Sequence, residues 1–356
     1  MPWTRKMCLL AAAACIAALA ACASAPAAPP QLASEDFMIP SNDPGISLFV
    51  RNKRPAGMAA FSADKTLLFV HGATFPSESS FDLQVGGMSW MDYIARHGWD
   101  VYLVDVRGFG RSTRPPANPG TVVATDANAL ADVGAAVDFI RQRRGIERIN
   151  LLGWSRGTIA MGRYAATHPG RVHKVVLYAP VWPPGTPPPS AGAAPSPSPG
   201  AAPPAEPTAA YRHIDVAATR ARWLQGVPAD KLQGLIPAGW FDAWVAATSA
   251  TDPWGAAQTP PVLRVPNGPV IDRIRMGRSG ALPYDPANIR SPILLVKAEW
   301  DADAPAAMAQ GLFPRLVNAP YKQYLEIGEG THSVLLERNR MQLFRAVQRF
   351  LDDPAP

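Results

Sequence analysis

Five short, almost uninterrupted apolar segments constrain the fold of this chain more than any other feature. Each has four to seven residues and is rich in β-branched, leucine or aromatic side chains: Thr66–Val70, Trp99–Val104, Ile149–Leu152, Val172–Tyr178 and Ile293–Val296. Such runs are typical of strands buried on both faces of a parallel sheet. Segments with helical spacing separate them. The sequence therefore predicts an α/β fold, a mostly parallel sheet flanked by helices.

Further elements are expected around these strands. The remaining predicted strands are Ile46–Val50, Gly57–Ser62 and Gln323–Ile327, with a turn at Lys53–Pro55. The predicted helices cover Met88–His97, Ala124–Arg144, the stretch from Gly157 to His168, Pro305–Leu316 and Val334–Leu351. Gly145 is a usual C-terminal stop for the second of these helices.

The alternation of strands and helices is interrupted after Ala179. Residues 180–207 hold 12 of the 39 prolines, mixed with Ala, Ser and Gly, which favours an unpacked insertion. Residues 210–285 contain several tryptophans and short helical patterns. We therefore expect a core of 41–180 and 286–356, a disordered insertion at 181–209, and a mainly helical cap at 210–285, inserted after the strand ending near Ala179.

The chain begins with the pattern of an export signal. Arg5 and Lys6 precede an apolar run, Met7–Ala18, which is shorter than the roughly 20 residues that span a membrane. Leu19–Cys22 resembles a bacterial lipobox, in which the cysteine is lipidated after cleavage. An ordinary signal cleaved near Ala21 or Ala23 is the alternative.

The lipobox reading implies a definite location. Residues 1–22 would be a lipoprotein signal and 23–40 a tether. A lipid on Cys22 would then hold an exported protein at the cell envelope, on the periplasmic face of the outer membrane.

Composition excludes several other classes of protein. The three cysteines, Cys8, Cys15 and Cys22, all lie in the signal, so the body can form no disulfide and no cysteine metal site. The net charge is only +6, without a Lys/Arg block interleaved with aromatics, so nucleic-acid binding is not expected.

One motif points to chemistry. Gly153–Gly157 reads G-x-S-x-G and lies between a predicted buried strand and a predicted helix. A sharp strand-to-helix turn exposes its serine, Ser155, and the helix N-terminus favours an oxyanion. Ser155 is therefore the candidate nucleophile.

A serine nucleophile needs a base that is held by a third group. Of the six histidines, His332 follows the last predicted strand in a loop that could reach Ser155. The acid is expected after Ile293–Val296, where Glu299, Asp301 and Asp303 are candidates and Asp301 is preferred. The resulting order is nucleophile, acid, base.

In this combination, residues 45–352 resemble the α/β-hydrolases that carry a cap domain. The motifs that carry the resemblance are His71-Gly72, Asp105–Ser112, the turn at Ser155, Glu299–Pro305 and Gly330–His332. It implies that Asp301, four residues before Pro305, is the acid. It also implies that the N–H groups of Ala73 and Arg156 form the oxyanion hole.

Two positions depart from the family pattern. Ala298 replaces the usual glycine, a mild change, and Arg156 places a charge directly after the nucleophile. Burying this guanidinium without a partner would be costly. It either contacts an anionic substrate or, as we prefer, forms a salt bridge with a neighbouring carboxylate.

The resemblance implies acyl transfer without a metal or organic cofactor. We expect hydrolysis of a carboxylic ester or lactone of a small apolar or aromatic substrate, with Trp154, Trp240 and Trp244 in the pocket. Proline iminopeptidase-like or amidase activity, carbon–carbon bond hydrolysis, and a non-catalytic binding protein on the same fold are the alternatives. The oligomeric state is not predicted.

Overall fold

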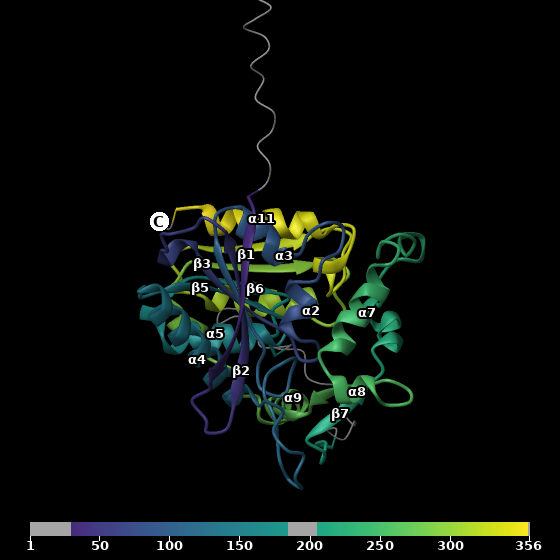
Figure 1. Cartoon of the computed structure of the whole chain (residues 1–356). Helices are drawn as coiled ribbons and strands as arrows, with labels where there is room; N and C mark the ends of the chain where they lie inside the picture. The colour runs from purple at the N-terminus through teal and green to yellow at the C-terminus, as the bar shows by residue number, and fades with distance from the viewer. Residues whose placement is uncertain (1–29, 184–204, 355–356) are drawn as a thin grey trace, which may run out of the picture. The chain divides into compact units, whose positions relative to one another are not determined.

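The computed structural model describes residues 30–183 and 205–354 (Figure 1). The predicted signal with Cys22 and most of the predicted insertion lie outside these residues. None of the helices within the described ranges combines the length and apolar composition needed to cross a membrane.

An eight-stranded sheet forms the centre of the fold, in the order β1-β2-β4-β3-β5-β6-β9-β10. The pairs β1–β2 and β2–β4 are antiparallel, and the other neighbours are parallel. The strands are β1 Leu32–Pro40, β2 Ser47–Pro55, β3 Thr66–Val70, β4 Asp100–Val104, β5 Ile149–Trp154, β6 Val172–Tyr178, β9 Ile293–Ala298 and β10 Lys322–Ile327. Together with the flanking helices, this sheet confirms the predicted α/β-hydrolase fold.

The N-terminal edge of the sheet corrects two predictions. Residues 32–40, expected in a tether, form β1, because each of them pairs with a residue of β2 in an unbroken antiparallel register. Residues 53–55 were expected to form a turn but continue β2, where Lys53 pairs with Val101 of β4. Residues 57–62 consequently form no strand.

Helices cover both faces of the sheet. In Figure 1, α3 Trp90–Arg96 and α11 Arg340–Asp352 lie above the sheet, and α4 Asp126–Arg144 and α5 Gly157–Thr167 lie below it. Short α2 Ser77–Phe81 follows β3, and α10 Ala306–Leu312 follows β9. The apolar side chains that the strands direct to both faces are thereby removed from water.

Local sequence signals explain where the longest helix begins and ends. Thr125 and Asn128 form a reciprocal capping box at the start of α4, which satisfies N–H groups that lack an intrahelical acceptor. Gly145 ends α4 with φ +64°, a left-handed conformation that glycine adopts without strain.

The segment after β6 contains helices and a small second sheet. Its helices are α6 Arg220–Trp223, α7 Trp240–Ala250, α8 Pro253–Ala256 and α9 Gly268–Ser279, and its antiparallel strands are β7 Tyr211–Ile214 and β8 Leu263–Pro266. We call the described residues 205–285 the cap segment. Figure 1 shows α7 and α8 at the right of the sheet and α9 beneath it.

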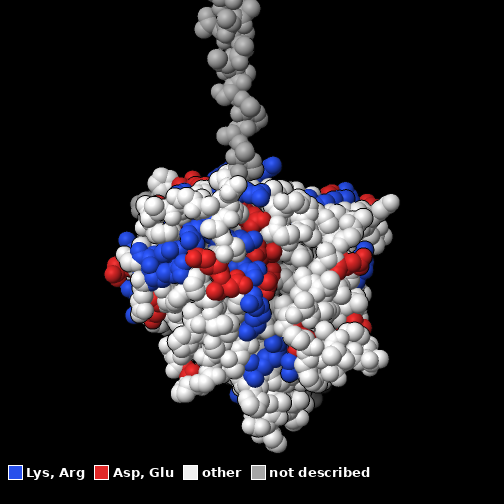
Figure 2. Space-filling model, viewed as in Figure 1, with Lys and Arg blue, Asp and Glu red and all other residues white. Residues whose placement is uncertain are grey.

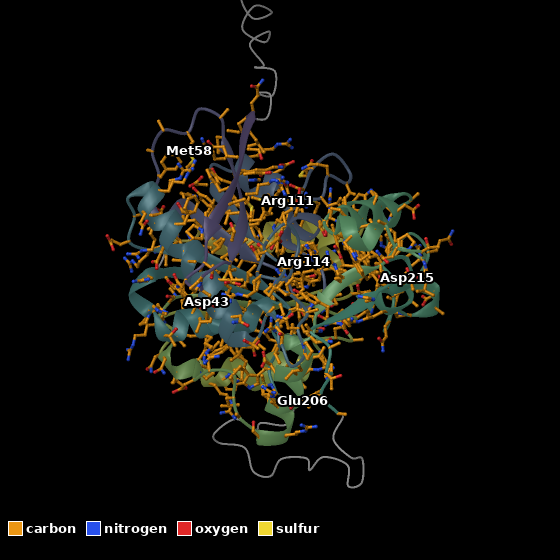
Figure 3. The ribbon with its side chains drawn as sticks, turned by 60° about the horizontal axis from the view of Figure 1, so that its bottom comes forward. Asp43, Met58, Arg111, Arg114, Glu206 and Asp215 are labelled. Atoms are coloured by element: carbon orange, nitrogen blue, oxygen red, sulfur yellow. The ribbon has the colours of Figure 1, made fainter. Side chains whose placement is uncertain are left out.

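Both described ends of the predicted disordered insertion are ordered, which corrects its boundaries. Trp182 is buried and packs edge-on against Tyr284 at a centroid distance of 5.3 Å. Glu206, labelled in Figure 3, forms ion pairs with Arg275 and Arg278 of α9. Packing and charge pairing therefore fix residues that composition alone assigned to a loop.

Charged side chains of both signs gather on the face that Figure 2 shows over β1 and β2, whereas the surface over α7 carries few. Arg51 and Arg111 both pair with Asp36, and Arg54 pairs with Glu35. Such cross-strand ion pairs favour this register of the edge strands.

Candidate active site

Ser155 stands on a strained turn between β5 and α5. Its φ is +55°, an unusual value for a residue with a side chain. The turn needs glycine at Gly153, where a Cβ would lie 2.3 Å from the carbonyl oxygen of Gly157. The backbone N–H of Ser155 donates to the Tyr178 carbonyl at 2.9 Å. Hydrogen bonding to β6 therefore maintains the strained conformation of Ser155. The Ser155 hydroxyl lies beyond the end of the sheet.

His332 lies in the loop that follows β10. Its Nδ1 is 2.9 Å from each carboxylate oxygen of Asp301. Its backbone carbonyl accepts hydrogen bonds from the Tyr178 hydroxyl at 2.7 Å and from the Trp154 Nε1–H at 3.1 Å. The loop is thus fixed from two strands, and the carboxylate orients the imidazole so that Nε2 points away from it.

The three candidate acids have different partners. Asp301 is buried and also accepts from the Ala304 N–H at 2.7 Å. Asp303 instead pairs with Arg222 at 3.0 Å, and Glu299 accepts from the Glu329 N–H at 2.9 Å. Of the three, only Asp301 contacts His332.

Ser155 and His332 line one small cavity of about 70 Å³. Residues from the loop after β3 and from the cap segment form most of the remaining wall: Gly72, Ala73, Thr74, Phe75, Thr219, Arg222, Trp223 and Trp244. Trp154, Asp303 and Ser333 complete it. The fold therefore brings the predicted nucleophile and base from distant parts of the chain to one space, where a substrate could touch both.

The two predicted oxyanion donors flank this space. The loop after β3 approaches Ser155 so closely that a Cβ at Gly72 would lie 3.2 Å from the Ser155 Cβ. Within the described residues, the backbone N–H groups of Ala73 and Arg156 donate to no acceptor. Both groups are therefore available to a developing oxyanion.

Buried His71 holds the loop that carries Ala73. Its Nε2 accepts from the Val106 N–H at 3.1 Å, which leaves the proton on Nδ1 to donate to the Gly72 carbonyl at 2.8 Å. Burial lowers the pKa of His71 to about 4. The ring is therefore neutral at physiological pH and acts as a fixed brace between two loops.

The Arg156 side chain has carboxylate partners. Its Nη2 lies 2.7 Å from Asp126 and 3.4 Å from Asp272, and donates to the Ala124 carbonyl at 2.9 Å. This arrangement matches the salt-bridge alternative that the sequence favoured.

The predicted pocket tryptophans divide into two groups. Trp154 and Trp244 line the small cavity, and Trp244 packs edge-on against Phe75 at 4.6 Å. Trp240 does not line it. Its ring, one turn of α7 before Trp244, instead lies 4.5 Å from the Arg340 guanidinium of α11.

Sequence reasoning missed Glu337. This fully buried carboxylate accepts from the Trp223 Nε1–H at 2.7 Å, from the Thr331 N–H at 3.0 Å and from the Thr331 hydroxyl. Burial raises the pKa of Glu337 above its ordinary value. A glutamate inside the otherwise apolar start of the last predicted helix was the available signal.

The described residues contain no group of three or more His, Cys, Asp or Glu side chains arranged to hold a metal ion.

Comparison with known proteins agrees with this architecture. The family model described as alpha/beta hydrolase fold matches residues 65–248, more than half of the chain. The chain therefore belongs to the alpha/beta hydrolase fold family.

One curated relative is a probable proline iminopeptidase from Streptomyces coelicolor, 36% identical over 85 residues. The match covers 24% of this chain and 26% of the relative, so the chain spans about a quarter of that protein.

Solved structures show the same fold at low sequence identity. A 2-hydroxy-6-oxo-6-phenylhexa-2,4-dienoate hydrolase from Rhodococcus sp. strain RHA1 is 15% identical, with a TM-score of 0.53 over 91% of this chain and 100% of that one. A thermophilic esterase from Thermogutta terrifontis is 16% identical, with a TM-score of 0.53 over 89% of this chain and 98% of that one.

Proposed function

We propose that this protein is a serine hydrolase that cleaves a carboxylic ester or lactone through an acyl-enzyme on Ser155. The observation that carries the proposal is the pairing of His332 Nδ1 with Asp301 at 2.9 Å, with both His332 and Ser155 lining one cavity. A histidine that is held by a buried carboxylate and shares a cavity with a strained serine is the arrangement that nucleophilic catalysis requires.

The reaction proceeds in two halves. His332 Nε2 takes the proton of the Ser155 hydroxyl as its oxygen attacks the carbonyl carbon, and then gives it to the departing alkoxide. Asp301 keeps the proton on Nδ1 and stabilises the imidazolium. Water, activated by His332, then releases the acid and restores Ser155.

The oxyanion of each tetrahedral intermediate is held by the N–H groups of Ala73 and Arg156. These donors are fixed before the reaction, Ala73 by the His71 brace and Arg156 by the start of α5. Loss of one such donor typically costs on the order of 10²–10³ in turnover.

A peptidase acting on a free amino terminus is the second candidate, favoured by the short match to the probable proline iminopeptidase. Such a substrate needs carboxylates to hold its ammonium group. The acidic side chains that line a cavity together with Ser155, Asp126 and Asp303, are already paired with Arg156 and Arg222. The charge of the site therefore supports the ester over the amine-bearing peptide.

Labelling with a fluorophosphonate probe tests the proposal. Purified protein should be labelled at Ser155, and Ser155→Ala should abolish both labelling and ester hydrolysis. Ser333 is the other serine in the wall of the small cavity, so Ser333→Ala is the matched control and should retain labelling. Mapping of the label to another serine, or retained hydrolysis in Ser155→Ala, would contradict the assignment. A panel of esters, lactones and aminoacyl arylamides then ranks the bond types.

A further inference from the structure

A second and larger cavity, of about 740 Å³, extends from the nucleophile. Ser155, Ala73 and Thr74 line both cavities, so whatever occupies the second one can reach the reacting serine. Its wall is mixed. The apolar part is formed by Ile159, Val181, Trp182, Pro183, Pro269, Val270, Met276 and Met308, and the charged part by Arg156, Arg212, Arg222, Arg273, Asp126 and Asp303.

Within this wall, Arg212 of β7, like Arg273 of α9, has no carboxylate partner among the described residues. Its guanidinium donates to two backbone carbonyls, Pro266 at 2.5 Å and Ala73 at 3.1 Å. By contrast, Arg156 and Arg222 each pair with an aspartate of the same wall.

The segments outside the described residues cannot supply the missing side-chain partner. Residues 1–29, 184–204 and 355–356 contain neither Asp nor Glu. The two bonds to carbonyls also leave N–H donors of the guanidinium fork unused. The chain therefore provides Arg212 with no acidic side chain of its own.

The surroundings of Arg212 disfavour its charge. Burial, together with the nearby guanidinium groups of Arg222, Arg156 and Arg273, lowers the pKa of Arg212 to about 10. It remains a cation at neutral pH, but one that lacks both full hydration and a counter-ion. Because a half-buried charge is costly unless it is paired, an anion entering this cavity would relieve the cost.

We propose that the substrate carries a carboxylate on the part that occupies this larger cavity, and that Arg212, with Arg273 beside it, binds this group. The apolar part of the wall would hold the carbon chain between the carboxylate and the scissile bond. The substrate class is thus an amphiphilic half-ester of a dicarboxylic acid, or an ester whose alcohol bears a carboxylate. This inference rests on the proposed hydrolase function only in treating the bound anion as a substrate. Anion binding itself can be measured without catalysis.

Binding to inactive protein tests the site directly. Calorimetry on Ser155→Ala compares monomethyl adipate, an anion, with neutral dimethyl adipate. We expect the anion to bind at least tenfold more tightly, a difference that shrinks at high salt because the charges are screened. Arg212→Gln in this background should remove the preference, whereas Arg212→Lys should keep part of it. Equal affinities, or a preference that survives Arg212→Gln in folded protein, would overturn the proposal.

Arg275→Gln is the matched control, since Arg275 lies on α9 two residues after Arg273 but pairs with Glu206 and does not line the cavity. Its anion preference should remain. A variant that unfolds is recognised by its melting temperature, in which case Arg212→Lys and Arg273→Gln carry the comparison.

Turnover on active protein separates this inference from the proposed function. Para-nitrophenyl esters whose acyl chain ends in a carboxylate are compared with their methyl esters, and butyrate esters of para-hydroxybenzoic acid with those of its methyl ester. One of these pairs should show kcat/KM at least tenfold higher for the anion. Hydrolysis of neutral esters alone would remove the charge preference and leave the serine hydrolase intact. Anion binding without any ester hydrolysis would support the anion site and contradict the proposed hydrolase function.

Discussion

The indole Nε1–H of Trp223 donates to the carboxylate of Glu337 at 2.7 Å, which joins the cap segment to the loop of the candidate base. The same carboxylate accepts from the N–H of Thr331, the residue that precedes His332. Trp223 lines the small cavity, so the wall of the pocket and the position of His332 depend on one buried group.

Glu337→Gln should therefore weaken both stability and turnover. The amide nitrogen of glutamine cannot accept, so one of the three donors facing residue 337 is left unsatisfied, at a cost of about 1–3 kcal/mol. Displacement of His332 should lower kcat about tenfold with little change in KM. Denaturant unfolding and ester kinetics measure the two effects.

Glu329→Gln provides the control for this substitution, because Glu329 belongs to the same loop but forms exposed ion pairs with Lys231 and Arg338. It should change the unfolding free energy by less than ~1 kcal/mol. If both variants behaved alike, Glu337 would have no special positioning role.

Two neighbouring aspartates should differ sharply in their effect on activity. Asp301→Asn removes the carboxylate that orients His332 and should lower kcat on the order of 10³–10⁴. Asp303→Asn removes a partly exposed partner of Arg222 in the cavity wall, which does not contact His332, and should change kcat less than about tenfold. Steady-state kinetics on a neutral ester measure kcat for both variants. A larger loss of kcat in Asp303→Asn than in Asp301→Asn would assign the role of the acid to Asp303.

His71 should make stability depend on acidity. Its pKa is 6.5 in the unfolded chain and about 4 in the fold, so the unfolded state binds the proton first. The contribution of His71 is present above pH 6.5 and is lost as the pH falls through about 4, by up to ~3 kcal/mol. Unfolding free energies of the parent and His71→Gln, measured from pH 7 to 4, should converge as the pH falls.

The comparison with His71→Gln is needed because Asp105 titrates in the same range with the opposite sign. Burial raises the pKa of Asp105 to about 6, so its protonation favours the fold as the pH falls. Because Asp105 is present in both proteins, its contribution cancels in the difference between their unfolding free energies. A difference that stays constant with pH would show that His71 does not titrate as described.

Trp244→Ala and Trp240→Ala should have distinct effects. Trp244 lines the small cavity, so its removal should change the ratio of kcat/KM between short-chain and aromatic esters. Trp240 packs on Arg340 and should leave this ratio unchanged while lowering the melting temperature. A shifted ratio in Trp240→Ala alone would reverse the assignment of the pocket wall.

The lipoprotein signal remains a prediction of the sequence. In a bacterial host with lipoprotein processing, the parent chain should partition with the envelope membranes, and Cys22→Ser should release activity into the soluble fraction. Metabolic labelling with a fatty-acid analogue checks the modification itself. Labelling that persists in Cys22→Ser would exclude Cys22 as the attachment site.

Sequence alone predicted the fold because its strongest signals are local. The apolar run Thr66–Val70 is completely buried in a strand, and Val172–Tyr178 is almost completely buried, as expected of strands that are covered on both faces of the sheet. The edge strand β1 escaped prediction because its residues alternate in exposure and their pairing with β2 is a nonlocal choice.

The candidate site shows the same division. Residue type and chain position selected Ser155 and His332. In the structure both residues line one cavity, and their catalytic roles remain proposals. The sequence pattern separated the neighbouring acid candidates Asp301 and Asp303 less strongly. In the structure, Asp301 contacts His332, whereas Asp303 pairs with Arg222. Likewise, nothing in the spacing of α7 separates Trp244 from Trp240.

Local sequence signals set the order of buried strands and helices, together with the strained serine turn, because burial periodicity and glycine geometry act over a few residues. Tertiary packing alone set which arginines of the larger cavity lack a carboxylate partner and which tryptophan of α7 reaches the pocket. Those contacts join loops that are far apart in the chain, such as Arg212 with Ala73 and Trp223 with Glu337. They depend on how whole elements pack, and that packing is not encoded in any single segment.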